Sequence, residues 1–385
     1  MTDKVRIRRE PLIHISKRIS FPVWKAMLIR FGAFLSALTF IAVLVYIIFG
    51  ISPSGLYSNM FKGAFLGKYL IPTLRYSAKL LCLAVALASA FKMRFWNIGA
   101  EGQMLAGAMA AAFIMHEYPG LPNWLLILLM CLGGMITGAL WGLVPAVFKS
   151  KFGTNETLFT LMMNYIAQKT VVYFYNLWRG GQPSLGKINN NIRMGENYHK
   201  GYFSNFWEGE KNPAWYQSED LWYVVIIAAI AVLMYIYLKK TKQGYEIAVV
   251  GDSLNTARYA GISVNRVIIR TMLISGAICG LCGFMTVSFQ SHSIAADIAG
   301  GYGFTAIIVT WMSRMNTLAM VGVSVLVVAL ERGSEAVKDT YNASTGFPSA
   351  TASIIVGLFL LFIIGSEFFI NYKLNFRRRS KKEVS

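Results

Sequence analysis

The stretch Phe95-Trp96-Asn97-Ile98-Gly99-Ala100-Glu101-Gly102-Gln103 places a carboxylate and two amides, spaced by glycines, beside long apolar segments. Such polar groups are costly to remove from water unless other polar groups satisfy them. Two alternatives follow for Asn97, Glu101 and Gln103. Either they pack into a polar cluster that satisfies itself, or they line a path for a polar solute.

The rest of the chain is built for lipid. Its 385 residues are 55% hydrophobic and only 14% charged. Several uncharged runs approach or exceed the ~20 residues that an α-helix needs to cross a bilayer. One soluble core of this size cannot bury them all, and the alternating ten-residue segments of a membrane β-barrel are not found. The sequence therefore predicts an all-α, polytopic membrane protein.

Ten stretches are predicted to cross the membrane as helices. They are 31–51, 70–91, 98–115, 125–148, 157–178, 221–238, 267–289, 304–312, 318–330 and 351–370. The spans 304–312 and 318–330 are short for a hydrocarbon layer ~30 Å thick, and Gly300-Gly301-Tyr302-Gly303 precedes them. They are either halves of broken helices around a central pathway or ordinary tilted helices.

The net charge of +19 is concentrated at the ends of the chain. Residues 1–30 carry eight Lys or Arg against two acids, and residues 373–385 carry six against one. Basic residues favour the cytoplasmic side, so both termini are predicted to be cytoplasmic, which agrees with an even number of crossings. This distribution predicts attraction to anionic lipids and argues against binding of nucleic acid.

The predicted organisation has three parts. A basic cytoplasmic segment, 1–30, precedes a transmembrane domain, 31–372, and a basic cytoplasmic tail, 373–385, follows it. Within the transmembrane domain, loop 179–220 has balanced charge and many aromatic residues, so it is predicted to lie outside and to be partly ordered. Loop 239–266 is basic at its ends and is predicted to be cytoplasmic.

The sequence offers no catalytic or metal-binding constellation. It has no complete P-loop, no His/Asp/Glu cluster with ligand spacing, and no credible nucleophile–His arrangement. Cys279-x-x-Cys282 has redox spacing, but it lies in an apolar span and is predicted to serve helix packing. Gly134-x3-Gly138-x3-Gly142 and Gly276-x3-Gly280 are predicted to allow close helix contact. We expect no enzyme activity, no catalytic residue and no bound metal.

Loop 239–266 contains a second informative feature. Asp252 or Ser253 is predicted to cap a short helix, 255–260, which Gly261 ends. This helix would expose small residues and dock into a groove on a partner, or else it belongs to a plain surface loop. The residues predicted to make the contact are Asn255, Ala257, Arg258, Ala260 and Gly261.

Four stretches together resemble a known family. They are 97–103 (NIGAEGQ), 154–165 (TNETLFTLMMNY), 251–262 (GDSLNTARYAGI), and 303–307 (GFTAI) followed by Met315-Asn316-Thr317. They resemble the membrane permeases of ABC importers in the ribose, nucleoside and branched-chain amino acid group, over about residues 70–370. The form of 97–103 resembles the nucleoside branch in particular, whereas loop 179–220 is longer than in the compact sugar permeases.

The resemblance implies a permease subunit in the plasma membrane of a prokaryote, with a small hydroxylated solute, foremost a nucleoside, as substrate. It implies a second permease subunit, the same or different, two cytoplasmic ABC ATPase domains and an extracytoplasmic substrate-binding lipoprotein. ATP would be used by these partners, and no cofactor would be bound by this chain. An ATP-independent secondary transporter is the alternative, although only Glu101 and Lys169 stand out as the intramembrane charges that it would need.

Within this resemblance the polar residues have competing roles. Glu101 either contacts the solute or accepts backbone N–H groups at the start of the span 98–115, and the second role is favoured. Asn97 and Gln103 remain pathway candidates, and Asn164, deeper in its span, is a better one. Lys169, a cation in the middle of a span, is expected to face a cavity or a partner. Thr154 and Asn155 are predicted to cap a helix.

Overall fold

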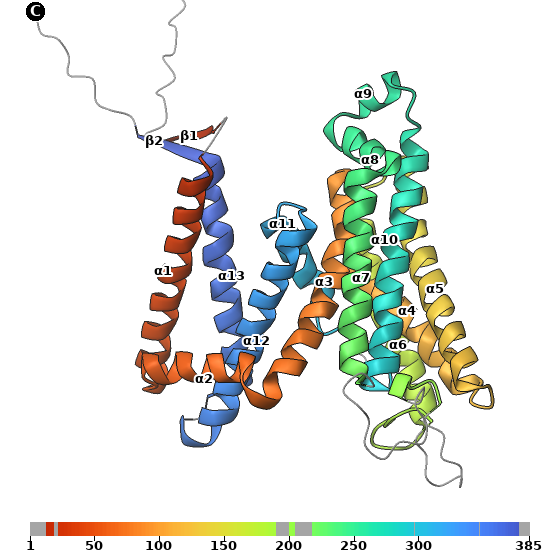
Figure 1. The fold of residues 1–385 in the computed structure, drawn as a ribbon, viewed down its shortest axis with the longest axis horizontal. Coiled ribbons are helices and arrows are strands. Elements are labelled where there is room, and N and C mark those ends of the chain that lie inside the picture. The colour runs from red at the N-terminus through yellow and green to blue at the C-terminus, as the bar shows by residue number, and fades with distance from the viewer. Residues whose placement is uncertain are drawn as a thin grey trace, which may run out of the picture. The chain divides into compact units, whose positions relative to one another are not determined.

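The computed structural model describes residues 13–18, 22–189, 200–204, 218–295, 297–345 and 347–376. Within these ranges the chain is helical except for one small sheet and short connections, which confirms the all-α class (Figure 1). The helices are α1 (Val23–Phe49), α2 (Pro53–Phe65), α3 (Leu70–Lys92), α4 (Ala100–Glu117), α5 (Asn123–Phe152), α6 (Glu156–Arg179), α7 (Glu219–Lys240), α8 (Lys242–Asp252), α9 (Leu254–Tyr259), α10 (Val264–Thr286), α11 (Tyr302–Met312), α12 (Thr317–Thr345) and α13 (Ser349–Asn371), with a 3-10 turn η1 (Gly67–Tyr69) and a π-helical turn η5 (Val287–Ser291).

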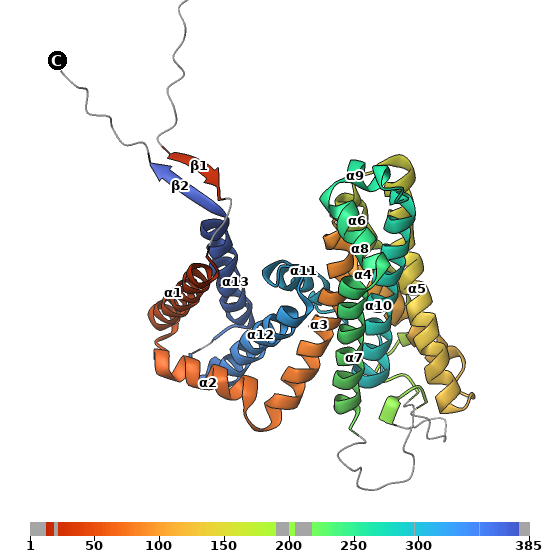
Figure 2. The same ribbon diagram turned by 45° about the horizontal axis from the view of Figure 1, so that its top comes forward.

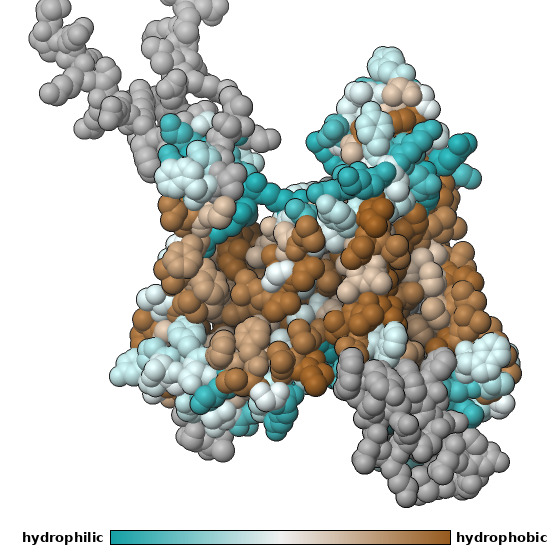
Figure 3. Space-filling view, in the orientation of Figure 1, coloured by the Kyte–Doolittle hydropathy of each residue, from teal (hydrophilic) through white to brown (hydrophobic). Residues whose placement is uncertain are grey.

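Each of the ten predicted spans coincides with a helix. Among the described residues, seven helices are long and apolar enough to cross a membrane: α1, α3, α5, α7, α10 extended by η5, α12 and α13. Apolar side chains cover the lengths of the helices and hydrophilic ones gather at their ends (Figure 3). A multi-pass membrane protein is therefore confirmed, whereas ten crossings and cytoplasmic termini remain predictions.

The two spans predicted to be short differ from each other. Helix α11 has 11 residues, which rise only ~16 Å, too little to cross the bilayer as one helix. Helix α12 has 29 residues, so the prediction of a second short span is wrong. The apolar run stops at Leu330, but the helix continues through charged residues, where Arg332 pairs with Glu335 at 2.6 Å.

The described residues form two compact units, and the larger one comprises Gly67–Val328. Its core is α10, which packs against α3, α4 and α5. Glycines make this contact close: a Cβ added to Gly280 would lie 2.1 Å from the carbonyl oxygen of Gly134, and one added to Gly138 would lie 2.4 Å from that of Gly276. The predicted packing role of these glycines is confirmed. Cys279 and Cys282 are buried free thiols in the same helix.

The smaller unit joins the residues up to Leu66 with those from Ala329. In it α1 packs along α13, and Arg30 pairs with Glu367 at 2.5 Å. Strand β1 (Ile13–Lys17) pairs antiparallel with β2 (Tyr372–Phe376), so that Ile13 lies opposite Phe376 (Figure 2). The sequence did not predict this sheet, nor that α1 begins at Val23, inside the segment 1–30.

The described parts of loop 179–220 pack against the end of α10. The ring of Tyr202 stacks on His292 with centroids 3.9 Å apart, and Phe203 stacks on Phe289 in η5 at 4.1 Å. The Tyr202 hydroxyl donates to the carbonyl of Ile188 at 2.7 Å. These contacts agree with the prediction of partial order. The aromatic residues Trp207, Trp215 and Tyr216 of this loop lie outside the described residues.

Candidate functional site

The stretch between α3 and α4 is held by a buried amide cluster. Asn97 accepts a hydrogen bond from the backbone N–H of Gly99 at 2.9 Å, and its amide exchanges two bonds of 3.4 Å with that of Gln103. Asn97 is fully buried and Gln103 nearly so. These bonds keep the chain out of helical geometry until α4 begins at Ala100.

Helix α6 completes the amide cluster from the other side. The side chain of Asn164 accepts from the N–H of Gly102 at 2.8 Å and donates to the carbonyl of Ile98 at 2.9 Å. The Thr160 hydroxyl accepts from the N–H of Ile98 at 3.2 Å. Asn164 is 5% exposed. Asn97, Gln103 and Asn164 thus form the packed cluster of the first alternative, and contact with a solute remains a prediction for them.

Glu101 binds the start of another helix. Its two carboxylate oxygens accept from the N–H groups of Gly301 at 3.0 Å and Gly303 at 2.6 Å, at the beginning of α11. A Cβ on Gly303 would lie 2.4 Å from the Glu101 nitrogen, so only glycine allows this approach. A carboxylate at a helix N-terminus is favourable because the exposed N–H groups carry partial positive charge. The sequence predicted this kind of role, but for the start of α4 rather than α11.

Lys79 is a functional candidate that the sequence analysis missed. It is only 3% exposed, and its ammonium donates to the carbonyl of Ile298 at 2.9 Å and lies 5.0 Å from the centroid of the Tyr302 ring. Its positive charge also acts on the carboxylate of Glu101. It precedes Lys92 by thirteen residues, or ~20 Å of helix, and so lies deep in α3. The criterion that singled out Lys169 applies equally to Lys79.

The other predicted residues of α6 are placed differently. Lys169 is exposed on α6 and lies outside the amide cluster. Asn155 caps the helix, accepting from the N–H groups of Thr157 and Leu158 at 3.0 and 3.2 Å, as predicted. Thr154 precedes the cap residue, so the capping role predicted for it belongs to Asn155 alone.

Loop 239–266 contains two helices rather than one. Thr241 caps α8 by accepting from the N–H of Gly244, and Ser253 caps α9 by accepting from the N–H of Thr256. Gly261, with φ of +72°, ends the second helix. Figure 1 shows α8 and α9 together at one end of α7 and α10, which they connect. The predicted short helix is confirmed within one residue, and α8 was not foreseen.

The exposure of α9 corrects one predicted contact residue. Ala257 is fully buried and anchors the helix, so the prediction that it is exposed is wrong. Its position one turn after Ser253 faces the core of the unit, while Asn255, Arg258, Ala260 and Gly261 are exposed. Two large side chains not predicted from the sequence also lie on this surface: Tyr259 is 93% exposed and Leu254 is 50% exposed.

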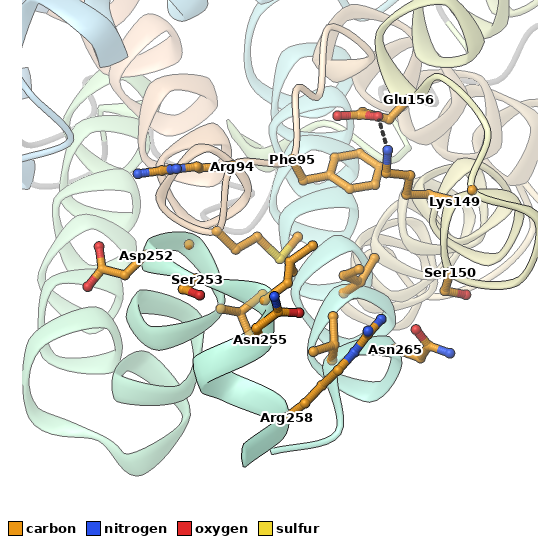
Figure 4. A pocket seen from close by; sticks show the side chains of 17 residues that line it. Arg94, Phe95, Lys149, Ser150, Glu156, Asp252, Ser253, Asn255, Arg258 and Asn265 are labelled. Atoms are coloured by element: carbon orange, nitrogen blue, oxygen red, sulfur yellow. Dashed lines mark ion pairs between the residues drawn. The ribbon is translucent and has the colours of Figure 1, made fainter. Parts of the chain in front are cut away.

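A pocket of about 670 Å³ lies beside α9, among the ends of α5, α6 and α10, and both charged and apolar side chains line it. Figure 4 shows Asn255 and Arg258 from α9 and Asn265 from α10 around it, with the Lys149–Glu156 ion pair on the side of α5 and α6. That pair measures 2.7 Å. With charges of both signs and an exposed helix at its edge, this face suits a polar protein surface. The described residues hold no group of three His, Cys, Asp or Glu that could bind a metal ion.

Comparison with known proteins gives a consistent result. The family model described as "Branched-chain amino acid transport system / permease component" matches residues 69–364. The chain is 29% identical to the guanosine ABC transporter permease protein NupP of Bacillus subtilis, an alignment that covers 84% of this chain and 89% of that protein.

Two further relatives are similar over most of their length. The chain is 28% identical to the nucleoside ABC transporter permease protein NupB of Lactococcus lactis subsp. cremoris, covering 87% of this chain and 88% of that protein. It is also 28% identical to the glucose ABC transporter permease protein TsgB13 of Haloferax volcanii, covering 94% and 93%.

Proposed function

Since this chain belongs to the family of branched-chain amino acid transport system permease components, we propose that it forms the membrane pathway of an ABC importer for nucleosides. Similarity to a guanosine permease and a nucleoside permease, over more than four fifths of the chain, supports this substrate class. The glucose permease among the relatives makes a sugar the second candidate, which shares the hydroxylated ring.

The α8–α9 segment is the observation that supports a permease driven by partner subunits. Its caps and the buried Ala257 fix α9 on the unit, while Tyr259 and Leu254 expose large side chains to a partner. A short helix that exposes large apolar and aromatic side chains together with Asn255 and Arg258 is the kind of feature that docks into a groove on a partner. We assign this surface to one of two cytoplasmic ATPase domains, which would hydrolyse the ATP.

The start of α11 favours a neutral solute. In broken transporter helices, an open helix N-terminus attracts anionic groups of the substrate. Here the carboxylate of Glu101 already occupies that position, and the positive charge of Lys79 acts on it. An anionic group brought close would find the N–H groups of Gly301 and Gly303 already bonded to Glu101. This supports a nucleoside rather than a nucleotide as substrate.

The remaining parts of the proposal follow from the family. The importer would contain a second permease subunit, the same or different, and an extracytoplasmic substrate-binding lipoprotein, in the plasma membrane of a prokaryote. The polar residues Asn97, Glu101, Gln103, Asn164 and Lys169 are retained as candidates for the pathway, with Lys79 added to them.

Uptake by cells that lack the chain, compared with complemented cells, tests the proposal. Complementation is expected to restore uptake of labelled guanosine or uridine, with competition by other nucleosides and none by guanosine monophosphate. Depletion of ATP should abolish this uptake. Restored uptake of glucose alone would establish the second candidate, and uptake that depends on ion gradients but not on the ATPase would establish a secondary transporter.

A further inference from the structure

We propose that α11 moves as one unit during transport, and that residues 96–101 guide it through Trp96 at one end and Glu101 at the other. The inference rests on the proposed function, because it concerns how a movement of the ATPases reaches the pathway. Trp96, Glu101 and Trp311 act as positioning residues.

Helix α11 is bounded by a sharp turn of the chain at each end. Gly300 and Gly301 precede it with φ of +63° and +73°, and Arg314 and Met315 follow it with φ of +48° and +58°. Two consecutive left-handed residues turn the chain sharply, and the second pair does so without glycine. A rigid helix of ~16 Å between two such turns can tilt without bending α10 or α12.

The stretch after α3 contacts α11 at both of its ends. The indole of Trp96 stacks on that of Trp311 in the last turn of α11, with centroids 5.2 Å apart and planes at 19°. The carboxylate of Glu101 binds the first turn through Gly301 and Gly303. Five residue steps from Trp96 to Glu101 reach at most ~17 Å, comparable to the length of α11, so the stretch runs alongside the helix.

The end of α3, which leads into this stretch, packs against α8. A Cβ on Gly251, in the last turn of α8, would lie 2.0 Å from the carbonyl oxygen of Lys92. The Lys92 ammonium in turn donates to the carbonyl of Leu238 in α7 at 3.0 Å. Because protein interiors are close-packed and resist compression, a displacement of α8 and α9 moves the start of the stretch.

Space for this movement lies beside the tryptophan pair. A pocket of about 310 Å³ separates Gly251 and Asp252 of α8 from Trp96 and Trp311. Phe91, which also lines this pocket, contacts both indoles, with ring centroids 5.9 Å from Trp96 and 6.1 Å from Trp311. The two indoles can therefore shift together as a pair toward α8 without opening the core.

A different role for the two indoles is anchoring at the membrane interface, which is common for tryptophan. Each is 45% exposed. Two indoles that anchor the chain at the interface act independently of each other. Two indoles that guide α11 by stacking lose the same ring contact whichever of them is removed. Additivity of the two substitutions therefore separates the roles.

The test uses the complete importer in proteoliposomes, with nucleoside uptake and ATP hydrolysis measured separately. For Trp96→Ala and Trp311→Ala we expect uptake to fall ~5–10-fold, as loss of an aromatic pair allows, while hydrolysis stimulated by the binding protein is retained. The double variant should be no worse than either single one, and Trp311→Phe should restore most uptake. Trp124→Ala is the matched control, since Trp124 is 59% exposed at the start of α5.

The amount of assembled complex, measured for each variant, separates coupling from folding. Additive losses in the double variant, a parallel fall in uptake and hydrolysis, or uptake equal to wild type in both single variants overturns the guiding role. If an alanine variant fails to assemble, uptake and hydrolysis by Trp311→Phe, which keeps an aromatic ring, are used for the same comparison. An error in the proposed substrate gives a different result, because the wild-type importer then transports another solute. The variants are then compared with the wild type using that solute.

Discussion

Removal of the Glu101 carboxylate should loosen the start of α11 more than any other single polar change in the larger unit. Glu101→Ala leaves the N–H groups of Gly301 and Gly303 without their acceptor and removes the negative charge near Lys79. A hydrogen bond to a charged group contributes ~1.5–3 kcal/mol. Because Glu101 accepts two such bonds, we expect a loss of ~3–6 kcal/mol.

Two milder substitutions resolve this value into its parts. Glu101→Gln keeps one acceptor oxygen but points an NH2 group at the other N–H, so we expect about half the loss, ~1.5–3 kcal/mol. Lys79→Met removes the cation and the donor to Ile298. Because Lys79 and Glu101 interact electrostatically, Lys79→Met combined with Glu101→Gln should cost less than the sum of the single losses, by ~0.5–2 kcal/mol.

Thermal unfolding of the purified chain in detergent measures the order of stabilities. The expected order is wild type, Glu101→Gln, then Glu101→Ala, with the double variant above the level that additive losses predict. Equal melting temperatures for Glu101→Ala and wild type would refute the view that this carboxylate holds α11. If the stability losses of Lys79→Met and Glu101→Gln are strictly additive in the double variant, the two charges are not coupled. The two hydrogen bonds of Glu101 would then account for its loss of stability.

Four other predictions test the remaining features. Tyr259→Glu and Ala260→Glu should abolish uptake without lowering the melting temperature, because both residues are exposed on or just after α9, whereas Ala257→Glu should lower it because Ala257 is buried. Gly280→Ala should destabilise the chain by ~1–3 kcal/mol or more, because its Cβ would lie 2.1 Å from the Gly134 carbonyl oxygen. In the same thermal unfolding assay Gly322→Ala should be neutral, because a Cβ there would have no neighbour within 4 Å. Asn164→Ala should cost ~1–3 kcal/mol for each of the two backbone groups left unpaired, and a melting temperature equal to wild type would contradict the amide cluster. Burial, with the charge of Glu219, raises the pKa of Tyr202 above its ordinary value of 10.0. Tyr202 should therefore stabilise the folded chain fully below pH ~10, and this contribution should be lost as the pH rises toward the folded-state pKa. Melting curves at alkaline pH should show this loss for the wild type, and Tyr202→Phe should remove it.

The helices could be predicted because long apolar runs are a local signal. Their packing glycines could be predicted for the same reason, since the spacing of Gly276 and Gly280 places both on one face of α10. The length of α12 could not, because the helix runs through Arg332 and Glu335, which hydropathy alone excludes from a span. The sheet between β1 and β2 joins strands more than 350 residues apart and leaves no local pattern in either.

In the candidate site, too, the local features could be predicted and the long-range contacts could not. That Glu101 accepts backbone N–H groups at a helix start follows from its residue type and glycine neighbours, but its partner helix lies 200 residues away in the chain. Ala257 was expected to be exposed because it is small, yet burial depends on which face of α9 meets the unit. Lys79 carried the same signal as Lys169, a lone cation within a span, and only the fold shows that the first is buried and the second exposed.

The two groups of polar residues near α4 have different consequences for movement. The amides of Asn97, Gln103 and Asn164 bind each other and the chain between Ile98 and Gly102, so they tie that stretch to α6. Glu101 and Lys79 instead bind backbone groups of the 298–303 segment across the core. A tilt of α11 therefore acts only on the second group of bonds, so Glu101 can stay bound to the first turn of α11 while the amides hold residues 98–102 against α6.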